Sequence, residues 1–375
     1  MTEFRVVNPL ASETYLKRTR EKAYELRGDY FRDQTALIHS MPFRRLKHKT
    51  QVFFAPENDH VCTRIEHVMH VATIAASICK GLRANGWDLD VELAFAIGLG
   101  HDLGHAPFGH AGEDALNKRL GGGSSFVHEV NSFRVIEYLA NDGHGLNLTY
   151  AVKDGIICHN GEEFEDSIKP STEPNDLSKI KDRKCKPSSY EGCVVRFADK
   201  IAYLGRDIED AIIAKIIKID NVPEGAREQL GNKNGQIIET LVVDLIESSK
   251  DSDQIMFSPE KHALMDQLKD FNYKYIYNSD YIRAYKRYGQ NIVTELFDYL
   301  CSLYCSYGRD FSAYEQSSIK FDKHFGRYLR KMDNFYKNEE DVPNKIVTDY
   351  VAGMTDLYAL ECMKQISLPS PLNFG

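Results

Sequence analysis

Apolar residues recur at helical spacing along much of this chain of 375 residues. Apolar positions that share one face over two or more turns predict buried or amphipathic helices. The segments with this pattern are residues 67–82, 94–99, 131–140, 201–217 and 236–249. The best candidate for a strand is TQVFFA at 50–55, and the sequence shows no alternation of strands with helices. The pattern therefore predicts an all-α fold and argues against a dinucleotide-binding α/β fold.

One long polar stretch, residues 160–192, interrupts the helical pattern. It contains prolines and shows no clear period, which is typical of a surface excursion between two core helices. We expect a helical core in residues 1–219 that includes this excursion, and a C-terminal helical region in residues 220–375 that packs on the core. The last residues, SLPSPLNFG (367–375), are expected to form a loose tail.

Composition restricts the class of protein. Hydrophobic residues make up 42% and charged residues 27% of the chain, as in soluble globular proteins. The net charge of −8 provides no global basic field for coating nucleic acid, so binding of single-stranded DNA is not indicated. The N-terminus lacks the apolar core of a signal peptide, and no run of about 18 apolar residues predicts a membrane span.

The cysteines favour a reducing compartment. Eight cysteines are scattered along the chain without a CxxC pair. We therefore expect buried, reduced thiols in a cytoplasmic protein. Cys301 and Cys305 are four residues apart on a predicted helix, where packing is the expected role.

Candidate chemistry is concentrated in GHDLGHAPFGHAGE (100–113), which holds three of the 13 histidines. This stretch is either a polar turn between helices or the centre of a reaction. His101 and Asp102 precede Gly104 and Pro107, which are expected to end a helix there. An imidazole and a carboxylate at one helix end often hold a divalent metal.

Two other helices offer partners for such a metal. His67 begins the predicted helix 67–82, and Asp199 lies in an apolar helical run, where an unpaired carboxylate is costly. Together with His101 and Asp102 they form a borderline-hard ligand set, suited to Mn²⁺, Fe²⁺, Mg²⁺, Ni²⁺ or Zn²⁺. A metal in such a set orients a phosphate and lowers the pKa of bound water.

The same stretch also contains a candidate for proton transfer. His110 and Glu113 are three residues apart at the expected start of the next helix, so the carboxylate can orient the imidazole as a general acid or base. His128 lies near another helix start, where a cap or surface position is the alternative.

A basic cluster lies upstream of the candidate metal residues. Residues 43–53 contain Arg44, Arg45, Lys47, His48 and Lys49. Three interpretations stay open for this cluster: a solvated face, phosphate contacts, or salt bridges between subunits.

The order His67, His101-Asp102, Asp199 resembles the H…HD…D signature of the HD-domain metal-dependent phosphohydrolases. The chain is also similar to the deoxyguanosinetriphosphate triphosphohydrolases and related dNTP triphosphohydrolases in the blocks RDQTALIHSMPFRRLKHKTQVF, DHVCTRIEHVMHVATIAASI, GLGHDLGHAPFGHAGE, VVRFADKIAYLGRDIEDA and DYVAGMTDLYAL. These blocks cover most of residues 28–215 and return at 349–360. The resemblance implies an all-α enzyme with an HD-domain core. Such an enzyme cleaves a dNTP between the 5′-oxygen and the α-phosphorus and releases deoxynucleoside and inorganic triphosphate.

The resemblance also implies roles for individual residues of the reaction centre. The residues that would ligate the metal are His67, His101, Asp102 and Asp199. The residues that would carry the proton-transfer chemistry are His110, oriented by Glu113, with His105 and His128 contacting phosphate or moving protons.

Five further positions match substrate-binding residues of that family. By this resemblance Arg64 would contact the nucleotide, Gln51 would lie near the sugar 3′-hydroxyl, and Lys200 would bind phosphate. Tyr203 and Asp207 follow Asp199 at i+4 and i+8 and therefore share one helix face. In the family this tyrosine packs under the deoxyribose and leaves no room for a 2′-hydroxyl, while the aspartate contacts the 3′-hydroxyl.

The C-terminal region resembles the family less closely. Leu357 stands where an arginine is common in the family, and residues 220–345 show weak resemblance. Arg283, Tyr285 and Lys286 are candidates for γ-phosphate and base contacts, with exposed helix positions as the alternative. The preferred base, dGTP or several dNTPs, is therefore open. Members of the family are commonly homo-oligomers, often hexamers; some are activated by a second dNTP, and some bind single-stranded DNA.

Two other functions stay open at this point. An HD phosphohydrolase for a nucleoside monophosphate, a cyclic nucleotide or guanosine tetraphosphate would keep the metal residues but lack Gln51, Arg64, Tyr203 and Asp207 as a group. A degenerate HD protein that binds nucleotide or nucleic acid as a sensor would bind without turnover.

Overall fold

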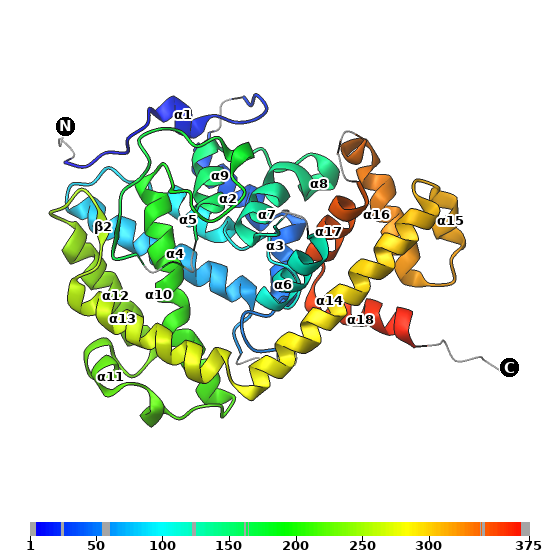
Figure 1. Ribbon diagram of the computed structural model, residues 1–375. Coiled ribbons are helices and arrows are strands. Elements are labelled where there is room, and N and C mark those ends of the chain that lie inside the picture. Colours follow the sequence, from blue (N-terminus) through cyan, green and yellow to red (C-terminus); the bar gives the residue numbers. More distant parts are fainter. Residues whose placement is uncertain are drawn as a thin grey trace.

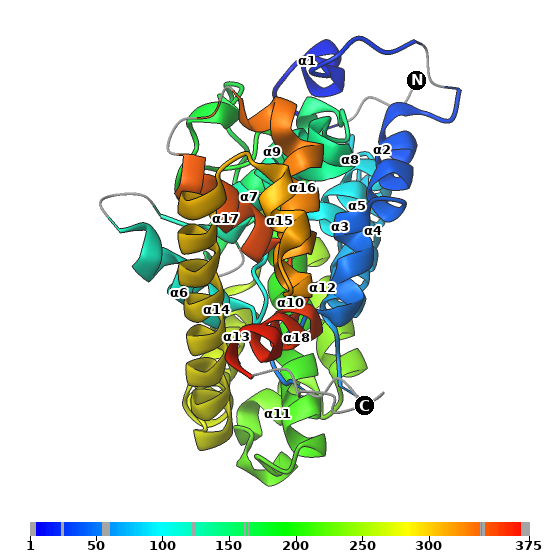
Figure 2. The same cartoon turned by 90° about the vertical axis from the view of Figure 1, so that its right-hand side faces the viewer.

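The computed structural model describes residues 5–23, 26–54, 61–121, 125–160, 163, 165–337, 339 and 342–368. As predicted, the fold is all-α, with helices packed directly on one another (Figures 1 and 2). The helices of the N-terminal part are α1 (Ser12–Leu16), α2 (Asp29–Ile38), α3 (Met41–Arg45), α4 (Arg64–Ala84), α5 (Val91–Gly100), α6 (His110–Leu120), α7 (His128–Arg134), α8 (Ala140–Gly143), α9 (Tyr150–Ile157) and α10 (Tyr190–Ile213).

The C-terminal part continues the helical architecture. Its helices are α11 (Glu224–Leu230), α12 (Asn234–Ser249), α13 (Pro259–Phe271), α14 (Asp280–Tyr307), α15 (Phe311–Gln316), α16 (Lys320–Tyr336), α17 (Val342–Ala352) and α18 (Asp356–Ser367). Short 3₁₀ turns cover Leu46–His48, Leu177–Lys179 and Ile219–Asn221, and π-helical turns cover Val135–Leu139 and Asn272–Tyr277. The strands of the described residues are β1 (Ser167–Ile168) and β2 (Ile255–Met256), which pair antiparallel.

The core is built around α4, α5 and α10. α5 is apolar along nearly its whole length and seven of its ten residues are buried, as expected of a helix surrounded by others. It packs closely on α4, because a Cβ on Gly98 would lie 2.6 Å from Cα of Ala72. α4 begins with a capping box in which the side chains of Thr63 and Glu66 satisfy the first backbone donors. These helices carry His67, at the first turn of α4, and His101, at the end of α5.

The buried apolar residues form two main clusters. The first extends from Val6 to Ile282 and includes α4, α5, α10, α12 and α13. The second joins Ala106, Phe108, apolar residues of α6 and Phe126 to apolar residues of α14, α16, α17 and α18. α14 crosses the molecule obliquely between the two groups of helices in Figure 1, and lies along one side in Figure 2. The proposed division at residues 219 and 220 stays a prediction, since residues 222–282 contribute to the first cluster.

The helices predicted at 67–82, 94–99, 131–140, 201–217 and 236–249 are confirmed, with shifted ends. α10 stops at Ile213 rather than 217, and residues 135–139 form a π-helical turn. The polar excursion ends before 192, because Ser189 caps α10 by accepting a hydrogen bond from the Gly192 N–H at 3.1 Å. The predicted tail, residues 367–375, lies almost entirely outside the described residues.

The strand predicted at 50–55 is wrong. Thr50 forms one isolated bridge with Thr63, and Phe53 is buried in the core instead of contributing to a sheet. Ala55 lies outside the described residues. Burial of the thiols is only partly confirmed, because Cys305 is exposed and Cys301 is half-buried, although all eight cysteines are free. Among the described helices, none combines the length and apolarity needed to cross a membrane.

Candidate active site

The turn between α5 and α6 brings the candidate residues together. His101 is the C-cap of α5, and His110 is the first residue of α6. The turn is held by α7: Gly104 N–H donates to Oγ of Ser132 at 2.8 Å, and that hydroxyl donates to the His101 carbonyl at 2.6 Å. A Cβ on Gly104 would lie 2.1 Å from the Ser132 nitrogen, so only glycine fits there.

The first cluster of the site joins three helices. His67 Nε2 lies 2.9 Å from Asp199 Oδ1, and His101 Nε2 lies 3.8 Å from the same oxygen. Asp102 Oδ1 is 3.5 Å from His101 Nε2. All four side chains are buried or nearly so. Burial alone would raise the pKa of Asp199, but His67 and His101 lower it to about 2, so the carboxylate is ionised.

These residues fit a divalent metal. One ligand atom from each of His67, His101 and Asp199 lies within 4.8 Å of the others. His101 Nδ1 is engaged with the Gly98 carbonyl at 2.7 Å, which leaves Nε2 directed toward the aspartates. Nε2 of His101 is buried without a hydrogen-bond partner, which is costly in a protein interior and typical of a ligand atom.

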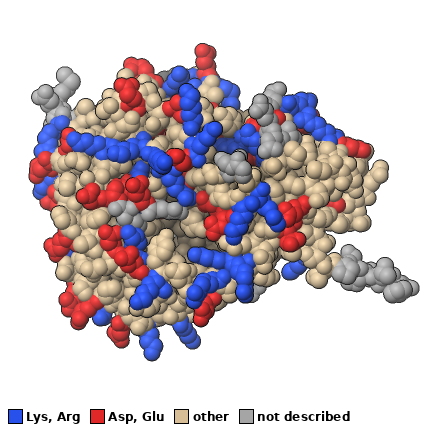
Figure 3. Space-filling model, viewed as in Figure 1, with Lys and Arg blue, Asp and Glu red and all other residues tan. Residues whose placement is uncertain are grey.

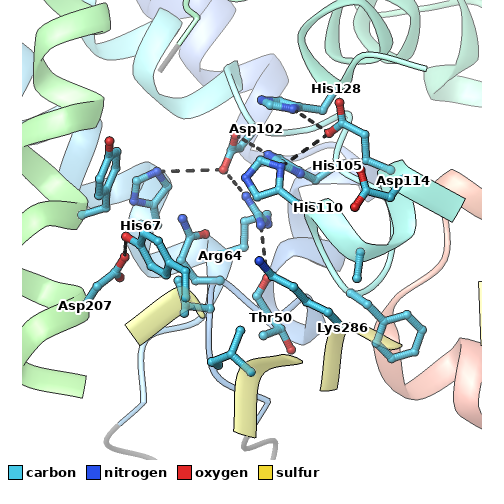
Figure 4. Close-up of a pocket in the computed structure, with 18 of the residues that line it drawn as sticks. Thr50, Arg64, His67, Asp102, His105, His110, Asp114, His128, Asp207 and Lys286 are labelled. Carbon is cyan, nitrogen blue, oxygen red and sulfur yellow. Dashed lines mark hydrogen bonds and ion pairs between the residues drawn. The ribbon is translucent and has the colours of Figure 1, made fainter. Parts of the chain in front are cut away.

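Asp102 connects this cluster to the next histidine. In Figure 4, Asp102 lies between His67 on one side and Arg64 and His105 on the other. Its Oδ1 is 3.1 Å from His105 Nε2, and its Oδ2 pairs with the guanidinium of Arg64. Burial favours a protonated Asp102, yet His105, His101 and Arg64 outweigh it and hold the pKa of the carboxyl well below its usual range. Burial and the nearby Arg64 lower the pKa of His105, so its imidazole is neutral.

A second cluster surrounds Glu113. Its Oε2 is 3.0 Å from His128 Nδ1 and 3.8 Å from His110 Nδ1. The ring of His128 stacks on that of His105, with centroids 3.8 Å apart. Burial opposes the charged form of His128, but Glu129 and Glu113 raise its pKa to about 9. His110 is more open, with 57% of its side chain exposed.

Both clusters lie on the wall of one cavity of about 440 Å³. On another side of this cavity, α10 contributes Tyr203 and Asp207, one and two turns beyond Asp199. Tyr277 Oη donates to Asp207 Oδ2 at 2.5 Å. Gln51 and Arg64 also line the cavity. In Figure 4 the chain segments around these side chains come from both halves of the sequence.

Comparison with known proteins agrees with this geometry. The HD domain family model matches residues 64–204, and the model of the phosphohydrolase-associated domain matches residues 255–365. Similar relatives carry the name deoxyguanosinetriphosphate triphosphohydrolase-like protein, and three of them are compared with this chain. They come from Caldanaerobacter subterraneus subsp. tengcongensis (38% identical, covering 98% of this chain and 94% of the relative), Desulfatibacillum aliphaticivorans (36%, 92% and 90%) and Clostridium perfringens (35%, 93% and 90%).

The chain belongs to the deoxyguanosinetriphosphate triphosphohydrolase-like family. It is therefore an HD-domain phosphohydrolase, a metal-dependent class of hydrolase, and the structure contains His and Asp groups that could bind a metal. The HD model spans His67 through Asp199, so it includes the whole candidate metal cluster.

The structure of this HD-domain phosphohydrolase brings most of the predicted site residues to the cavity. Those that line it are Gln51, Arg64, His67, Asp102, His105, His110, Glu113, His128, Asp199, Tyr203 and Asp207. His101 does not line the cavity, but it belongs with His67 and Asp199 to a group that could hold a metal. Of the C-terminal candidates, Tyr285 and Lys286 line the cavity, whereas Arg283 is paired with Asp280 at 2.8 Å and is not part of the wall.

Lys200 is placed away from the cavity. Its side chain is 1% exposed, and Nζ donates to Glu165 Oε2 at 2.6 Å. Neighbouring residues of a helix point in different directions, so a lysine directly after Asp199 faces another part of the interior. A phosphate contact by Lys200 stays a prediction, and it requires the ammonium group to leave Glu165.

Several residues of this phosphohydrolase site are absent from the sequence-based prediction. Arg183, from the polar excursion, lines the cavity and contacts Glu113. His159 lies beside His101, with ring centroids 4.9 Å apart, and burial lowers its pKa to about 4. Tyr277 reaches Asp207 from a π-helical turn. A lone buried histidine, tyrosine or arginine has no spacing motif, and only the fold reveals its neighbours.

Proposed function

We propose that this chain hydrolyses a dNTP, dGTP or several dNTPs, to deoxynucleoside and inorganic triphosphate. One observation carries the proposal. A single cavity is lined by metal-ligating residues, by a histidine cluster suited to proton transfer and by residues suited to a nucleotide sugar. We assign the metal to His67, His101, Asp102 and Asp199, the proton transfer to His110 and Glu113 with His105 and His128, and substrate binding to Gln51, Arg64, Lys200, Tyr203 and Asp207.

A bound Mn²⁺, Mg²⁺, Fe²⁺, Ni²⁺ or Zn²⁺ supplies Lewis-acid polarisation of a phosphate and activates water. The chain's own cations offset the charge of the triphosphate: Arg64 and Lys286 both line the cavity. Arg64 also donates to the Thr50 carbonyl at 3.2 Å, which fixes the guanidinium in the wall.

His110 handles the proton in this mechanism. Because its Nδ1 is turned toward Glu113, Nε2 is the atom that gives or takes the proton. The water oxygen bonds to the α-phosphorus while the bond from phosphorus to the 5′-oxygen breaks. The water loses a proton and the 5′-oxygen gains one, so the products are deoxynucleoside and triphosphate.

Selection against ribonucleotides is assigned to α10. Tyr203 and Asp207 share the helix face that begins at Asp199, so a sugar placed over this face has its α-phosphate near the metal cluster. The ring of Tyr203 would then occupy the space that a 2′-hydroxyl needs. Asp207, held by Tyr277, would accept a hydrogen bond from the 3′-hydroxyl.

Product analysis tests the proposal. The purified protein is incubated with each dNTP alone and in pairs, with Mn²⁺ or Mg²⁺, and the products are separated. We expect deoxynucleoside and triphosphate. Release of pyrophosphate or monophosphate would assign the chain to the HD phosphohydrolases of other nucleotides, and tight binding without turnover would indicate a sensor. Turnover only in mixtures would show that a second dNTP activates the enzyme.

We also propose a cytoplasmic homo-oligomer, hexameric by analogy with the family. Size-exclusion chromatography with light scattering measures the molar mass of the assembly with and without dNTP. The face in Figure 3 carries basic and acidic groups interspersed, which does not favour an extended track for single-stranded DNA.

A further inference from the structure

Arg183 bridges the two buried carboxylates of the proton-transfer cluster. Its Nε donates to Glu129 Oε1 at 2.7 Å, and its Nη2 donates to Glu113 Oε1 at 2.9 Å. Nη2 also lies 3.1 Å from His128 Nδ1. The carboxylates are 1% and 7% exposed, whereas the arginine is 29% exposed and lines the cavity. The polar excursion therefore contributes a side chain to the site.

The contacts divide the two oxygens of Glu113 between different partners. Oε1 accepts from Arg183, and Oε2 faces His128 and His110. A carboxylate with one oxygen fixed in this way cannot rotate freely about its last bond. The guanidinium on Oε1 and His128 on Oε2 together fix the plane of the carboxylate that faces His110, the imidazole that we propose for proton transfer.

Charge favours a second cation at this position, because the His128 imidazolium offsets only one of the two carboxylates. Burial alone would raise the pKa values of Glu113 and Glu129, but the nearby His128 lowers both, and Arg183 also lowers that of Glu129. Both carboxylates are therefore ionised. Two anions beside a cavity that receives a triphosphate would repel it unless they are neutralised. A planar guanidinium presents its N–H groups in a rigid fork that suits two separate carboxylates, whereas an ammonium group acts as a compact point charge.

The backbone from Arg183 to Lys186 is held by side chains of other segments. Its carbonyl accepts a hydrogen bond from Asn160 Nδ2 at 3.1 Å. The carbonyl of Cys185 accepts from Arg196 of α10 at 3.2 Å, and that of Lys186 accepts from Asn175 at 2.9 Å. The excursion is therefore anchored where Arg183 enters the site.

We infer that Arg183 is a positioning residue, which holds Glu113 so that its second oxygen orients His110. The inference rests on the proposed function of His110 and Glu113. Arg183 acts through Glu113, and its loss changes the rate of the chemical step more than the binding of substrate.

A double-mutant cycle tests this role. We expect Arg183→Gln to lower kcat about 10- to 100-fold, the range typical of residues that orient an active-site group, with KM changed less than about 3-fold. Arg183→Lys should recover little activity, because it reaches one carboxylate. Once Glu113→Gln is present, adding Arg183→Gln should cost no further activity. Lys184→Gln, the same charge change one residue later on an exposed side chain, is the control and should match the wild type.

Other results would overturn the inference. Additive losses in the double variant, or a rise in KM alone, would assign Arg183 to direct phosphate binding. A crystal structure of Arg183→Gln with Glu113 unmoved relative to His110 would also overturn it, whatever the substrate. If the wild type releases no triphosphate from any dNTP, the proposed function is contradicted instead. The orientation of Glu113 in the crystal structure of Arg183→Gln then still decides the role of Arg183.

Discussion

Asp356 Oδ1 accepts a hydrogen bond from the backbone N–H of Phe108 at 2.9 Å, although the two residues are 248 positions apart. Asp356 Oδ2 accepts from the N–H of Thr50, also at 2.9 Å. Phe108 has a φ of 63°, which is unusual for a residue with a side chain. One carboxylate at the start of α18 thus supports the turn that leads into His110 and the segment that carries Gln51. Lys49 adds a second link, because it donates to the carbonyls of His105 and Ala352.

We predict that Asp356→Asn lowers both stability and kcat. The amide can accept only one of the two backbone donors, and a buried donor left without a partner costs about 1–3 kcal/mol. Displacement of the turn by about 1 Å would lower kcat by as much as about 100-fold. The measurements are thermal unfolding and saturation kinetics with the dNTP that the wild type prefers.

The matched control for this variant is Thr355→Ala. Thr355 caps the same helix by accepting from the Tyr358 N–H at 3.2 Å, and loss of a cap costs about 1 kcal/mol. We expect a small fall in melting temperature with unchanged kcat. Equal kcat in Asp356→Asn and the wild type would show that α18 does not position the turn.

The sequence predicts a site residue where a titratable side chain occupies a position that the helical period places on a particular helix face. Asp199 stands out because a carboxylate in an apolar helix needs a partner, and His110 with Glu113 stands out because three residues bring both to one face. Arg183, Tyr277 and Asp356 were missed because each reaches the site from a segment whose own pattern indicates a loop or an ordinary helix. Their roles depend on contacts between distant segments, such as Arg183 with Glu113, 70 positions apart.

Substitution should separate the proposed metal ligands from the histidine proposed for proton transfer. We expect Asp199→Ala and His101→Ala to lose bound metal and activity, because each removes a ligand from a buried cluster. His110→Ala should keep the metal while kcat falls about 100- to 10,000-fold, the usual contribution of a general acid or base. Elemental analysis by mass spectrometry measures the metal, and His39→Ala, on an exposed histidine, is the control. Loss of metal from His110→Ala would make His110 a ligand.

Removal of the metal should be reversible. Chelation with EDTA should abolish hydrolysis, and addition of Mn²⁺ or Mg²⁺ should restore it, because His67, His101 and Asp199 are held in place by the helices rather than by the ion. Circular dichroism should show the same helical content before and after chelation. Activity that survives complete removal of metal would contradict the assignment of these residues.

Stability of the metal-free protein should depend on pH through Asp207. Burial raises the pKa of Asp207 to about 7, although the hydrogen bond from Tyr277 lowers it in part. In the unfolded chain the carboxyl has a pKa of about 4. Between these two values the folded state binds a proton that the unfolded state has lost. Stability therefore falls as pH rises from about 4 to about 7, and the loss is complete above the folded pKa. Asp207→Asn lacks this titration.

Thermal unfolding of Asp207→Asn and the wild type, at pH 5 and pH 8, measures the effect. We expect the difference in melting temperature, variant minus wild type, to be more positive at pH 8 than at pH 5. The corresponding free energy is at most about 4 kcal/mol, from the difference between the two pKa values. Asp280→Asn, on an exposed aspartate, should show no such difference. A constant offset between the Asp207 variant and the wild type would place the pKa of Asp207 in its ordinary range.

Discrimination against ribonucleotides should depend on Tyr203. Its position one turn after Asp199 places it on the cavity wall next to the metal cluster, where the sugar of a bound nucleotide would lie. Tyr203→Ala removes the ring and opens space for a 2′-hydroxyl. We therefore expect the ratio of kcat/KM for dGTP to that for GTP to fall by about 10-fold or more, since a steric contact of this size is worth roughly 1–3 kcal/mol. Tyr203→Phe keeps the ring and should keep the ratio. If Tyr203→Ala lowers activity toward both nucleotides equally, the ring supports the site without selecting the sugar, and discrimination must then come from another side of the cavity.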